Sequence, residues 1–453
     1  MKEHSRAQTR QWRAGEAPGA LPLLGHGLAL RRTPLAFLSS LPARGDIVRI
    51  RLGPSTAYVL CAPELVHQIL AAPEIFDKGG PIFDRARETM GNGIGTSLRH
   101  VHRRQRALMQ PSFSSQRITG YSKVMHEEVQ RVVTSWSDGC AIDAAEVFGE
   151  LAARATIRTL LGAHLTEKEI TALIPHLDRA FHLAYRRMTA PIAALTRLPT
   201  PSTRAFWESI TAIRALAQVC INRHRQEGGS PDSLIAALVS TTTDERAFTD
   251  EELLDQIVTL FFAGTESTGA ALTWTFYHLA NNPGAEEALH REVDDVLGGK
   301  PASVSDLPML GQVNRCLTES LRLTPPSWLL SRTVTSPAEL GGVKLPAGTT
   351  VFFSPYILHH LPEVFPAPED YEPDRWLPER ASRRQKAALL PFGHGARRCI
   401  GDTFGMTEAS LALATIATRW RLAPDSDAPP AQQAIALTLN LRTFPVIPAR
   451  RKH

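Results

Sequence analysis

The sequence predicts a single large domain that is mostly α-helical and carries a small β-rich lobe. Apolar residues recur three and four positions apart through long stretches in the middle of the chain, which indicates helices. Nearer the two ends, polar and apolar residues alternate, as is typical of strands. No Gly/Ser-rich linker, repeat or low-complexity block divides the 453 residues. We therefore expect a flexible segment over residues 1–20 and one domain over residues 21–450.

The β-rich lobe is expected to draw on both ends of the chain. Residues 46–52 and 57–61 alternate on either side of Gly53 and Pro54, which predicts a β-hairpin. Helical spacing then covers residues 127–136, 144–161, 167–183 and 204–225. Strand-like segments return at residues 342–345, 349–353 and 436–441.

Composition and charge exclude several classes of protein. The net charge is +5, but no basic stripe with interleaved aromatic residues indicates nucleic-acid binding. Five scattered cysteines contain no CxxC pair that would predict a zinc site or a disulfide framework, so a reducing cytoplasm fits best. The apolar patch at residues 21–30 is short and broken by glycines, so we expect no transmembrane anchor.

A long buried helix is predicted from Thr249 onward. Thr249 and Glu252 have the spacing of a capping box, and the residues that follow are apolar on most sides of a helix. The helix is expected to reach Ala280, a length on the order of 45 Å. Two residues in its middle break the usual rules for a buried helix. Gly264 destabilises a helix by about 1 kcal/mol relative to alanine, and a buried acid, Glu266, is more destabilising still unless it is paired.

Such local breaks often mark a functional site. Glu266 is followed by two hydroxyl side chains, Ser267 and Thr268. An acid beside a hydroxyl is suited to relaying protons. The alternative is a helix kink in which a hydroxyl bonds back to a carbonyl.

The segment around Cys399 carries the most specific pattern. Phe392, Gly395, Arg397, Cys399 and Gly401 stand at offsets 0, 3, 5, 7 and 9. A thiolate on haem iron explains each type: glycines let the backbone approach a flat macrocycle, an arginine binds a propionate, and a phenylalanine keeps water from the sulfur. A helix expected from residue 402 would favour the thiolate through its N-terminal N–H groups. A lone cysteine is more often a small core residue, but core burial does not require this pattern.

With these residues the chain resembles the cytochrome P-450 superfamily of haem-thiolate monooxygenases over residues 20–450. The resemblance implies the cytochrome P-450 fold, haem b as cofactor, and Cys399 as the axial ligand of the haem iron. It implies that Arg397, Arg332, His102 and Arg106 lie at the haem propionates.

The resemblance also favours the relay over the kink, with Glu266, Ser267 and Thr268 as catalytic residues and small Ala263 and Gly264 leaving room for O2. Relatives usually have threonine directly after the acid, whereas this chain has serine and then threonine. Adjacent helical residues point about 100° apart, so only one hydroxyl faces the iron, and the sequence leaves open which one.

A structural triad is implied beside the haem. Glu319 and Arg322 lie one helical turn apart, and Arg375 follows in the segment before the cysteine. The resemblance makes these three a Glu-Arg-Arg triad that fixes the cysteine segment and takes no part in bond making.

The implied substrate pocket is mostly apolar, which favours a hydrophobic small molecule. Its expected residues are Phe261, Phe262, Ala263, Gly264, Trp328, Leu329, Leu330, Leu437 and Thr438. The segments 22–27, 34–38 and 45–54 are similar to those of actinobacterial oxygenases of cyclic sesquiterpenes. This implies a cyclic terpenoid of secondary metabolism; a fatty acid, polyketide or other apolar natural product is the alternative.

Electrons are expected from NAD(P)H through a separate ferredoxin and ferredoxin reductase, because about fifty residues after the cysteine leave no room for a fused reductase. Basic residues at 99–106 and 383–386 form either a docking face for an acidic partner or a merely solvated surface. Arg103, Arg104 and Arg398 are the candidate docking residues. A peroxide-driven hydroxylase or isomerase is disfavoured by the pair Glu266 and Ser267, and a non-catalytic haem sensor is the alternative from another class.

Overall fold

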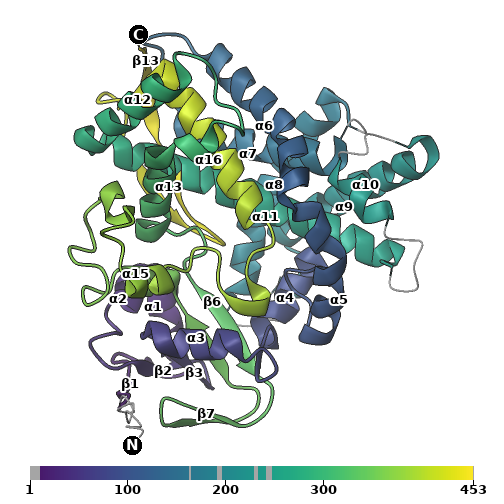
Figure 1. Cartoon of the computed structure of the whole chain (residues 1–453). Helices are drawn as coiled ribbons and strands as arrows, with labels where there is room; N and C mark the ends of the chain where they lie inside the picture. Colours follow the sequence, from purple (N-terminus) through teal and green to yellow (C-terminus); the bar gives the residue numbers. More distant parts are fainter. Residues whose placement is uncertain (1–10, 163–164, 191–195, 229–232, 241–246, 452–453) are drawn as a thin grey trace, which may run out of the picture.

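The computed structural model describes residues 11–162, 165–190, 196–228, 233–240 and 247–451. Helices make up most of the molecule, and α11 (Asp250–Ala280) passes through the middle of them (Figure 1). The largest sheet lies at the end of the molecule that carries the N-terminus (Figure 1). The expected α-rich body with a smaller β-rich lobe is confirmed.

The helices that surround α11 are long and amphipathic or largely buried. They are α5 (Arg99–Met109), α6 (Ser115–Ser135), α7 (Ala144–Leu161), α8 (Glu167–Met188), α9 (Pro201–Glu227), α12 (Pro283–Leu297), α13 (Gly311–Leu323) and α16 (Asp402–Arg419). Shorter helices are α1 (Gly27–Arg32), α2 (Pro34–Ser39), α3 (Pro63–Ala71), α4 (Gly80–Met90), α10 (Leu234–Ser240), α14 (Pro355–His359) and α15 (Arg383–Ala388). One apolar core fills the space between the long helices, and a second lies under the sheet.

The main sheet has six strands in the order β1-β2-β3-β9-β6-β4. They are β1 (Ala14–Glu16), β2 (Ile47–Leu52), β3 (Ser55–Leu60), β9 (Thr350–Phe353), β6 (Leu330–Val334) and β4 (Phe76–Asp77). The predicted hairpin is β2 with β3, paired antiparallel from Ile47 opposite Leu60 to Leu52 opposite Ser55. Strand β9 pairs parallel with β3, so segments from both ends of the chain do meet in one sheet.

Smaller sheets join the C-terminal residues to the helices. They contain β10 (Trp420–Pro424), β13 (Pro445–Arg450) and β5 (Ile142–Asp143) in one sheet, β11 (Gln432–Ile435) with β12 (Leu439–Thr443), and β7 (Ala338–Leu340) with β8 (Val343–Leu345). Among the described residues, no helix has the length and apolar character needed to cross a bilayer.

Two boundaries differ from the sequence prediction. The segment 1–20 was expected to be flexible, but β1 lies within it and pairs in parallel with β2, so its last part belongs to the fold; residues 1–10 lie outside the described residues. The strand predicted at 436–441 starts later, at Leu439, because Ala436 N–H donates to Thr438 O and closes the turn between β11 and β12.

Helix α11 begins with the predicted capping box. The Thr249 hydroxyl accepts from the N–H of Glu252, and the Glu252 carboxylate accepts from the N–H of Thr249. Glycines let α11 cross α7 closely: a Cβ on Gly264 would lie 2.8 Å from Thr156 Oγ1, and one on Gly269 would lie 3.0 Å from Gly149 Cα. The crossing therefore fixes the middle of α11 against a second buried helix.

Candidate active site

The segment around Cys399 is a tight turn that leads into α16. Cys399 N–H donates to Phe392 O at 2.8 Å, and Gly401 is the N-cap of α16, as predicted. Gly395 has φ +69°, and a Cβ on it would lie 2.5 Å from Leu70 O. Glycine is needed at 395 because the turn lies against α3, a reason that the sequence did not predict; close approach to a macrocycle stays a prediction.

The Cys399 side chain has exposed surface, although surrounding protein excludes bulk water from it. Its surface accessibility is that of an exposed residue, yet desolvation raises the pKa of its thiol. The Gly401 N–H and the positive charges of Arg106 and Lys78 act in the opposite direction and favour the thiolate. We call the space beside this accessible but desolvated thiol the hollow.

Three cations gather beside this hollow, and we call Lys78, Arg332 and Arg397 the cation cluster. Arg332 is 4% exposed, and its Nη1 donates to the carbonyl of Ser331 at 2.8 Å. Arg397 forms an ion pair with Asp77 and donates to Ser97 O at 2.9 Å. Lys78 Nζ donates to Gly95 O at 2.7 Å. Strands β4 and β6 and the cysteine turn thus bring these residues together.

The cation cluster carries more positive charge than its neighbours compensate. Desolvation, and then the charges of Arg332 and Arg397, lower the pKa of Lys78 to about 7. Desolvation and Arg397 lower the pKa of Arg332 to about 10. Asp77 is the carboxylate that acts on both in the opposite direction. Two additional carboxylates would balance this cluster, so it fits the two propionates of a haem whose iron lies at Cys399.

His102 and Arg106 lie on α5 beside the same hollow, but they differ in what they contact. His102 is buried, and desolvation with the nearby charges of Arg397 and Lys78 lowers the pKa of its ring to about 3, so it is neutral. Arg106 donates to the carbonyl of Arg398 and, through Nε, to Gln110 Oε1 at 2.8 Å. Arg106 therefore contacts the cysteine turn itself, whereas it was expected at a propionate.

The acid in the middle of α11 titrates near physiological pH. Desolvation, opposed by the nearby Thr438 hydroxyl and assisted by the charge of Asp178 on α8, raises the pKa of Glu266 to about 7. Glu266 Oε2 is buried and has no hydrogen-bond partner among the described residues. A buried, unsatisfied carboxyl with a pKa near 7 is suited to take up and release a proton.

The two hydroxyls after Glu266 point in different directions. Ser267 Oγ donates to Ala263 O at 2.7 Å, on the face of α11 where Ala263 is exposed although Phe262 is buried. Thr268 is buried and faces α16, where a Cβ on Gly405 would lie 3.6 Å from its Oγ1. The back-bonded hydroxyl that the kink interpretation described is thus present at Ser267, on the accessible face of the helix.

The expected pocket residues fall into two groups. Gly264 faces α7 through its contact with Thr156, so it does not provide the room for O2 that was expected; the exposed Ala263 lies one residue before it. Phe262 packs against Phe181 of α8 with ring centroids 4.6 Å apart and the rings tilted by 50°, and Phe261 is fully buried.

The other pocket residues connect β6 to the turn between β11 and β12. Trp328 is buried and donates from Nε1 to Ala436 O at 3.1 Å, so it supports this turn from inside the lobe. Leu329, Leu330 and Leu437 are half-buried, and Thr438 is buried near Glu266. Thr438 thus brings the turn between β11 and β12 close to the acid, with the apolar Leu437 next to it in the chain.

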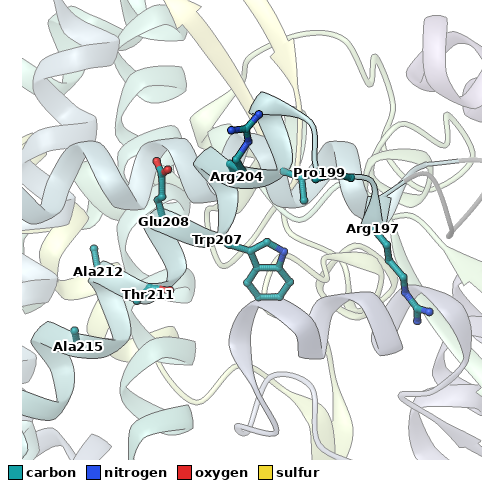
Figure 2. A pocket seen from close by; sticks show the side chains of 9 residues that line it. Arg197, Pro199, Arg204, Trp207, Glu208, Thr211, Ala212 and Ala215 are labelled. Carbon is teal, nitrogen blue, oxygen red and sulfur yellow. The ribbon is translucent and has the colours of Figure 1, made fainter.

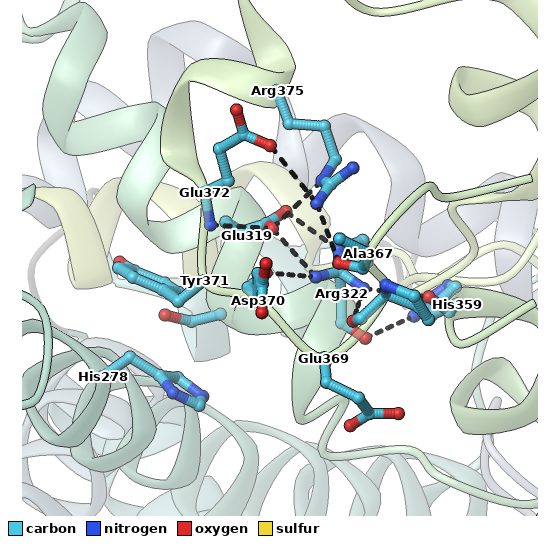
Figure 3. A network of polar contacts seen from close by, with 12 residues as sticks. His278, Glu319, Arg322, His359, Ala367, Glu369, Asp370, Tyr371, Glu372 and Arg375 are labelled. Atoms are coloured by element: carbon cyan, nitrogen blue, oxygen red, sulfur yellow. Dashed lines mark hydrogen bonds and ion pairs between the residues drawn. The ribbon is translucent and has the colours of Figure 1, made fainter. Parts of the chain in front are cut away.

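The structure brings Glu319, Arg322 and Arg375 together in a buried network (Figure 3). Arg322 donates from Nε to Glu319 Oε2 and from Nη2 to Oε1, both at 2.9 Å, and Arg375 Nε donates to Oε1 at 3.2 Å. The remaining donors of the two arginines reach the carbonyls of His359, Pro366, Ala367, Pro368 and Asp370. We call these three residues the triad network; it fastens α13 to residues 366–376.

Two surface hollows lie outside this site. One of about 760 Å³ is formed mainly by α9 and the residues before it, with Arg197, Arg204, Trp207 and Glu208 among its lining (Figure 2). It contains none of the predicted site residues. A smaller one of about 190 Å³ lies behind the cysteine turn and includes Phe392 and Arg398.

Sequence reasoning missed Asp77, Lys78 and His359. Asp77 and Lys78 are adjacent opposite charges, a pattern that usually indicates a solvated surface, and only the pairing of β4 with β6 brings them to Arg332. His359 is buried, accepts at Nε2 from Leu390 N–H at 2.9 Å, and lies 3.0 Å through Nδ1 from Arg322 O. It joins the triad network to the residues just before the cysteine turn.

Comparisons with known proteins show the family to which the chain belongs. A family profile described as "Cytochrome P450" matches residues 16–444. "Cyclooctatin synthase" of Streptomyces melanosporofaciens is 44% identical over 94% of this chain and 93% of its own length. "Cyclooctat-9-en-7-ol 5-monooxygenase" of the same species is 41% identical, covering 92% of this chain and 91% of that protein. "Pentalenene oxygenase" of Streptomyces avermitilis is also 41% identical, covering 92% and 93%.

A solved structure shows the same fold at low sequence identity. The "cytochrome P450DA heme domain" superposes with a TM-score of 0.87 at 24% identity, covering 98% of this chain and 99% of that one. The expected fold and the similarity to actinobacterial terpenoid oxygenases are thereby confirmed.

Proposed function

Because the chain belongs to the cytochrome P450 family, we propose that it is a monooxygenase that inserts one oxygen atom of O2 into a cyclic terpenoid. Monooxygenase chemistry with a haem-iron cofactor follows from the family. The identity of the haem, the roles of individual residues, the substrate and the electron donor are our proposals. The observation that carries the proposal is the accessible but desolvated Cys399 thiol beside an under-compensated cation cluster.

Haem b fits the residues on either side of the hollow. Cys399 would bind the iron, and Lys78, Arg332 and Arg397 would bind the two propionates. When bound, the haem supplies the electron transfer and oxygen activation by which one oxygen atom enters a C–H bond and the other leaves as water. The protein holds the thiolate, compensates the propionates and excludes bulk water.

Proton supply is assigned to Glu266 and Ser267. Glu266 can hold a proton at Oε2 near neutral pH, because desolvation raises its pKa to about 7. Ser267 is the better relay hydroxyl of the two, since it lies on the face of α11 that carries the exposed Ala263, whereas Thr268 packs toward α16. The bond from Ser267 Oγ to Ala263 O costs little to exchange for one to water.

A terpenoid substrate is supported by the relatives and by the apolar side chains that are expected to line the pocket. The three Streptomyces proteins are named for oxidations of cyclic terpenoids or for the product of one. Phe262, Leu329, Leu330 and Leu437 offer shape and apolar surface, while Thr438 and Glu266 provide the few polar groups.

We assign electron supply to a separate ferredoxin and NAD(P)H-dependent reductase in the cytoplasm. One of the three candidate docking residues is already engaged within the protein, because Arg104 is bound to Glu252 and to Ala247 O. Arg103 is exposed on α5, and Arg398 is exposed beside the hollow behind the cysteine turn, with Asp402 as its ion-pair partner. These two cations are the preferred contacts for an acidic partner.

Replacing Cys399 tests the proposed function directly. In Cys399→Ala we expect the reduced protein to lose the strongly red-shifted carbon monoxide band that a thiolate-bound haem gives, together with terpenoid oxidation. Cys140→Ala is the matched control, since Cys140 is also an exposed free cysteine. Persistence of the band in Cys399→Ala would refute the ligand assignment.

A further inference from the structure

The glycine-rich segment 91–97 lies directly on the first half of α11. A Cβ on Gly93 would lie 2.1 Å from Thr259 Oγ1, and a Cβ on Gly95 would lie 3.0 Å from Thr259 Cγ2. Gly91 has φ +65°, and a Cβ there would lie 2.0 Å from Asp255 Oδ1. Alternate glycines therefore let this loop, which we call the glycine loop, approach one helix face without side chains between them.

Asp255 joins this loop to two helices. Its carboxylate is 5% exposed; Oδ2 accepts from Asn92 N–H at 2.7 Å, and Oδ1 accepts from Arg214 Nη1 of α9 at 2.8 Å. The next residue, Gln256, accepts through Oε1 from Ile94 N–H at 2.8 Å. One buried carboxylate thus connects α11, α9 and the backbone of the glycine loop.

The far end of the glycine loop reaches the cation cluster. Lys78 donates to Gly95 O at 2.7 Å, Arg87 donates from Nη2 to Thr96 O at 3.0 Å, and Arg397 donates to Ser97 O at 2.9 Å. Lys78 is close enough to Cys399 for their charges to interact. The glycine loop therefore spans the distance from α11 to the residues beside Cys399 and forms a wall of the hollow.

We propose that Asp255 is a positioning residue that sets the place of the glycine loop and couples it to α9, and thereby decides which bulky ligands the pocket admits. Asp255 does not touch the reacting atoms. Moving its carboxylate shifts the part of the wall that lies on α11, while Cys399 keeps its bond to Phe392 O and Arg397 keeps its ion pair with Asp77. The inference rests on the proposed function only in taking this hollow as the haem and substrate cavity.

A second ion pair between α9 and α11 provides a control, because it joins the same two helices without a described contact to the glycine loop. Arg225 of α9 binds Asp250 of α11 through two bonds, at 3.0 and 2.6 Å, and among the described contacts it has none with the glycine loop. Asp250→Asn and Arg225→Met thus weaken the same pair of helices without loosening the loop. They are matched controls for Asp255→Asn and Arg214→Met.

The test uses the haem-loaded protein and two azoles that bind haem iron, imidazole and 4-phenylimidazole, titrated by their Soret shifts. In Asp255→Ala we expect the affinity for 4-phenylimidazole to fall about tenfold, because the glycine loop loses a charge-assisted bond that holds it in place. The affinity for the smaller imidazole should stay within about twofold of that of the parent protein. Asp255→Asn keeps an acceptor for Asn92 N–H and should lose less. Equal losses for both azoles, or losses as large in Asp250→Asn, would overturn the proposal.

Hydrogen exchange gives a readout that does not depend on ligands or turnover. Peptides covering residues 90–98 should exchange faster in Asp255→Ala than in the parent protein, and unchanged in Asp250→Asn. If Asp255→Ala does not fold, Asp255→Asn and Arg214→Met carry the same comparison. Unchanged exchange in all Asp255 and Arg214 variants would contradict the positioning role. If Cys399 proved not to be the iron ligand, the expected exchange result would still hold.

Discussion

The triad network and the cation cluster are both buried and both built around arginines, yet they differ in how fully their charges are compensated. In the triad network, one carboxylate accepts from two guanidinium groups, from Trp376 Nε1 at 2.8 Å and from Glu372 N–H at 3.1 Å. Backbone carbonyls take the remaining arginine donors. In the cation cluster, desolvation and then the charges of neighbouring members lower the pKa values of Lys78 and Arg332, with Asp77 as counter-charge.

The difference indicates which polar cluster serves the fold and which serves a ligand. A buried charge is tolerated when it is paired and hydrogen-bonded. The triad network meets this condition within the protein, so it stabilises the fold with or without a cofactor. The cation cluster meets it only when an anionic group binds, so its residues are held at some cost to the empty protein.

The largest expected effect breaks the triad network. Glu319→Ala would leave two buried guanidinium groups without their carboxylate, so we expect unfolding free energy to fall by about 3–5 kcal/mol, measured by urea denaturation with and without haem. Glu369→Ala is the control, because the Glu369 side chain is 76% exposed and its carboxylate lies 3.7 Å from His360 Nε2 at the surface. A loss in Glu319→Ala no larger than in the control would contradict the structural role.

The opposite response is expected from the cation cluster. Arg332→Met removes a cation that Arg397 repels, so the haem-free protein should be as stable as the parent or more stable. Haem should dissociate about 10–100-fold faster, as expected for loss of a bond to a charged group, measured by transfer to an excess of apomyoglobin. Lys78→Met should change in the same sense, and the exposed Arg49→Met serves as control. Unchanged haem dissociation would remove these cations from the propionate site.

A pH dependence sharpens the comparison, because His359 links the triad network to the cysteine turn as a neutral ring. Desolvation lowers its pKa to about 3, below its usual value of 6.5. The unfolded chain therefore takes up a proton first as pH falls, so stability is full above about pH 6.5 and is lost toward pH 3, by ~1.4 kcal/mol per pH unit for this group.

Between pH 4 and pH 6, we expect the slope of unfolding free energy against pH to be smaller in His359→Gln than in the parent protein, by the contribution of one proton. Urea denaturation at several pH values measures this slope. His278 and His102 have similarly lowered pKa values and keep the rest of the dependence in the variant. An identical slope in parent and variant would mean that His359 is protonated in the folded protein.

The smallest effect on stability is expected on the accessible face of α11, which carries Ala263 and Ser267. Ser267→Ala should change unfolding free energy by about 0.5 kcal/mol or less but raise the hydrogen peroxide formed per NAD(P)H consumed, because proton supply is weakened. Thr268→Ala should leave the peroxide yield near that of the parent, since Thr268 faces α16. The reverse ranking would assign the relay to Thr268.

Local signals predicted most of the fold. The 249–252 capping box, the helical spacing at 144–161 and the alternation at 46–52 each correspond to an observed element, because caps, periodicity and turns act over a few residues. Strand β6 was not predicted: Leu330 was expected to line the pocket and Arg332 to bind a propionate, but the pairing of β6 with β9 and β4 joins segments far apart in the chain.

The site was predictable where one short motif carries it. The cysteine turn and the triad residues follow from local spacing together with the family resemblance. Lys78 and Asp255 were not predictable, since a lone lysine or aspartate in the sequence gives no sign that a distant strand or loop will enclose it. The choice between Ser267 and Thr268 likewise needed the position of α16 beside the helix.

The close crossing of α11 and α7 limits how this enzyme can be redesigned. Any side chain at 264 or 269 would have to force two core helices apart, because the neighbouring atoms lie only 2.8–3.0 Å from an added Cβ. Directed evolution toward larger or differently shaped substrates should therefore fix few changes at these positions. Diversity should instead accumulate at the exposed Ala263 and at Leu329, Leu330 and Leu437, whose side chains are only partly enclosed by neighbours.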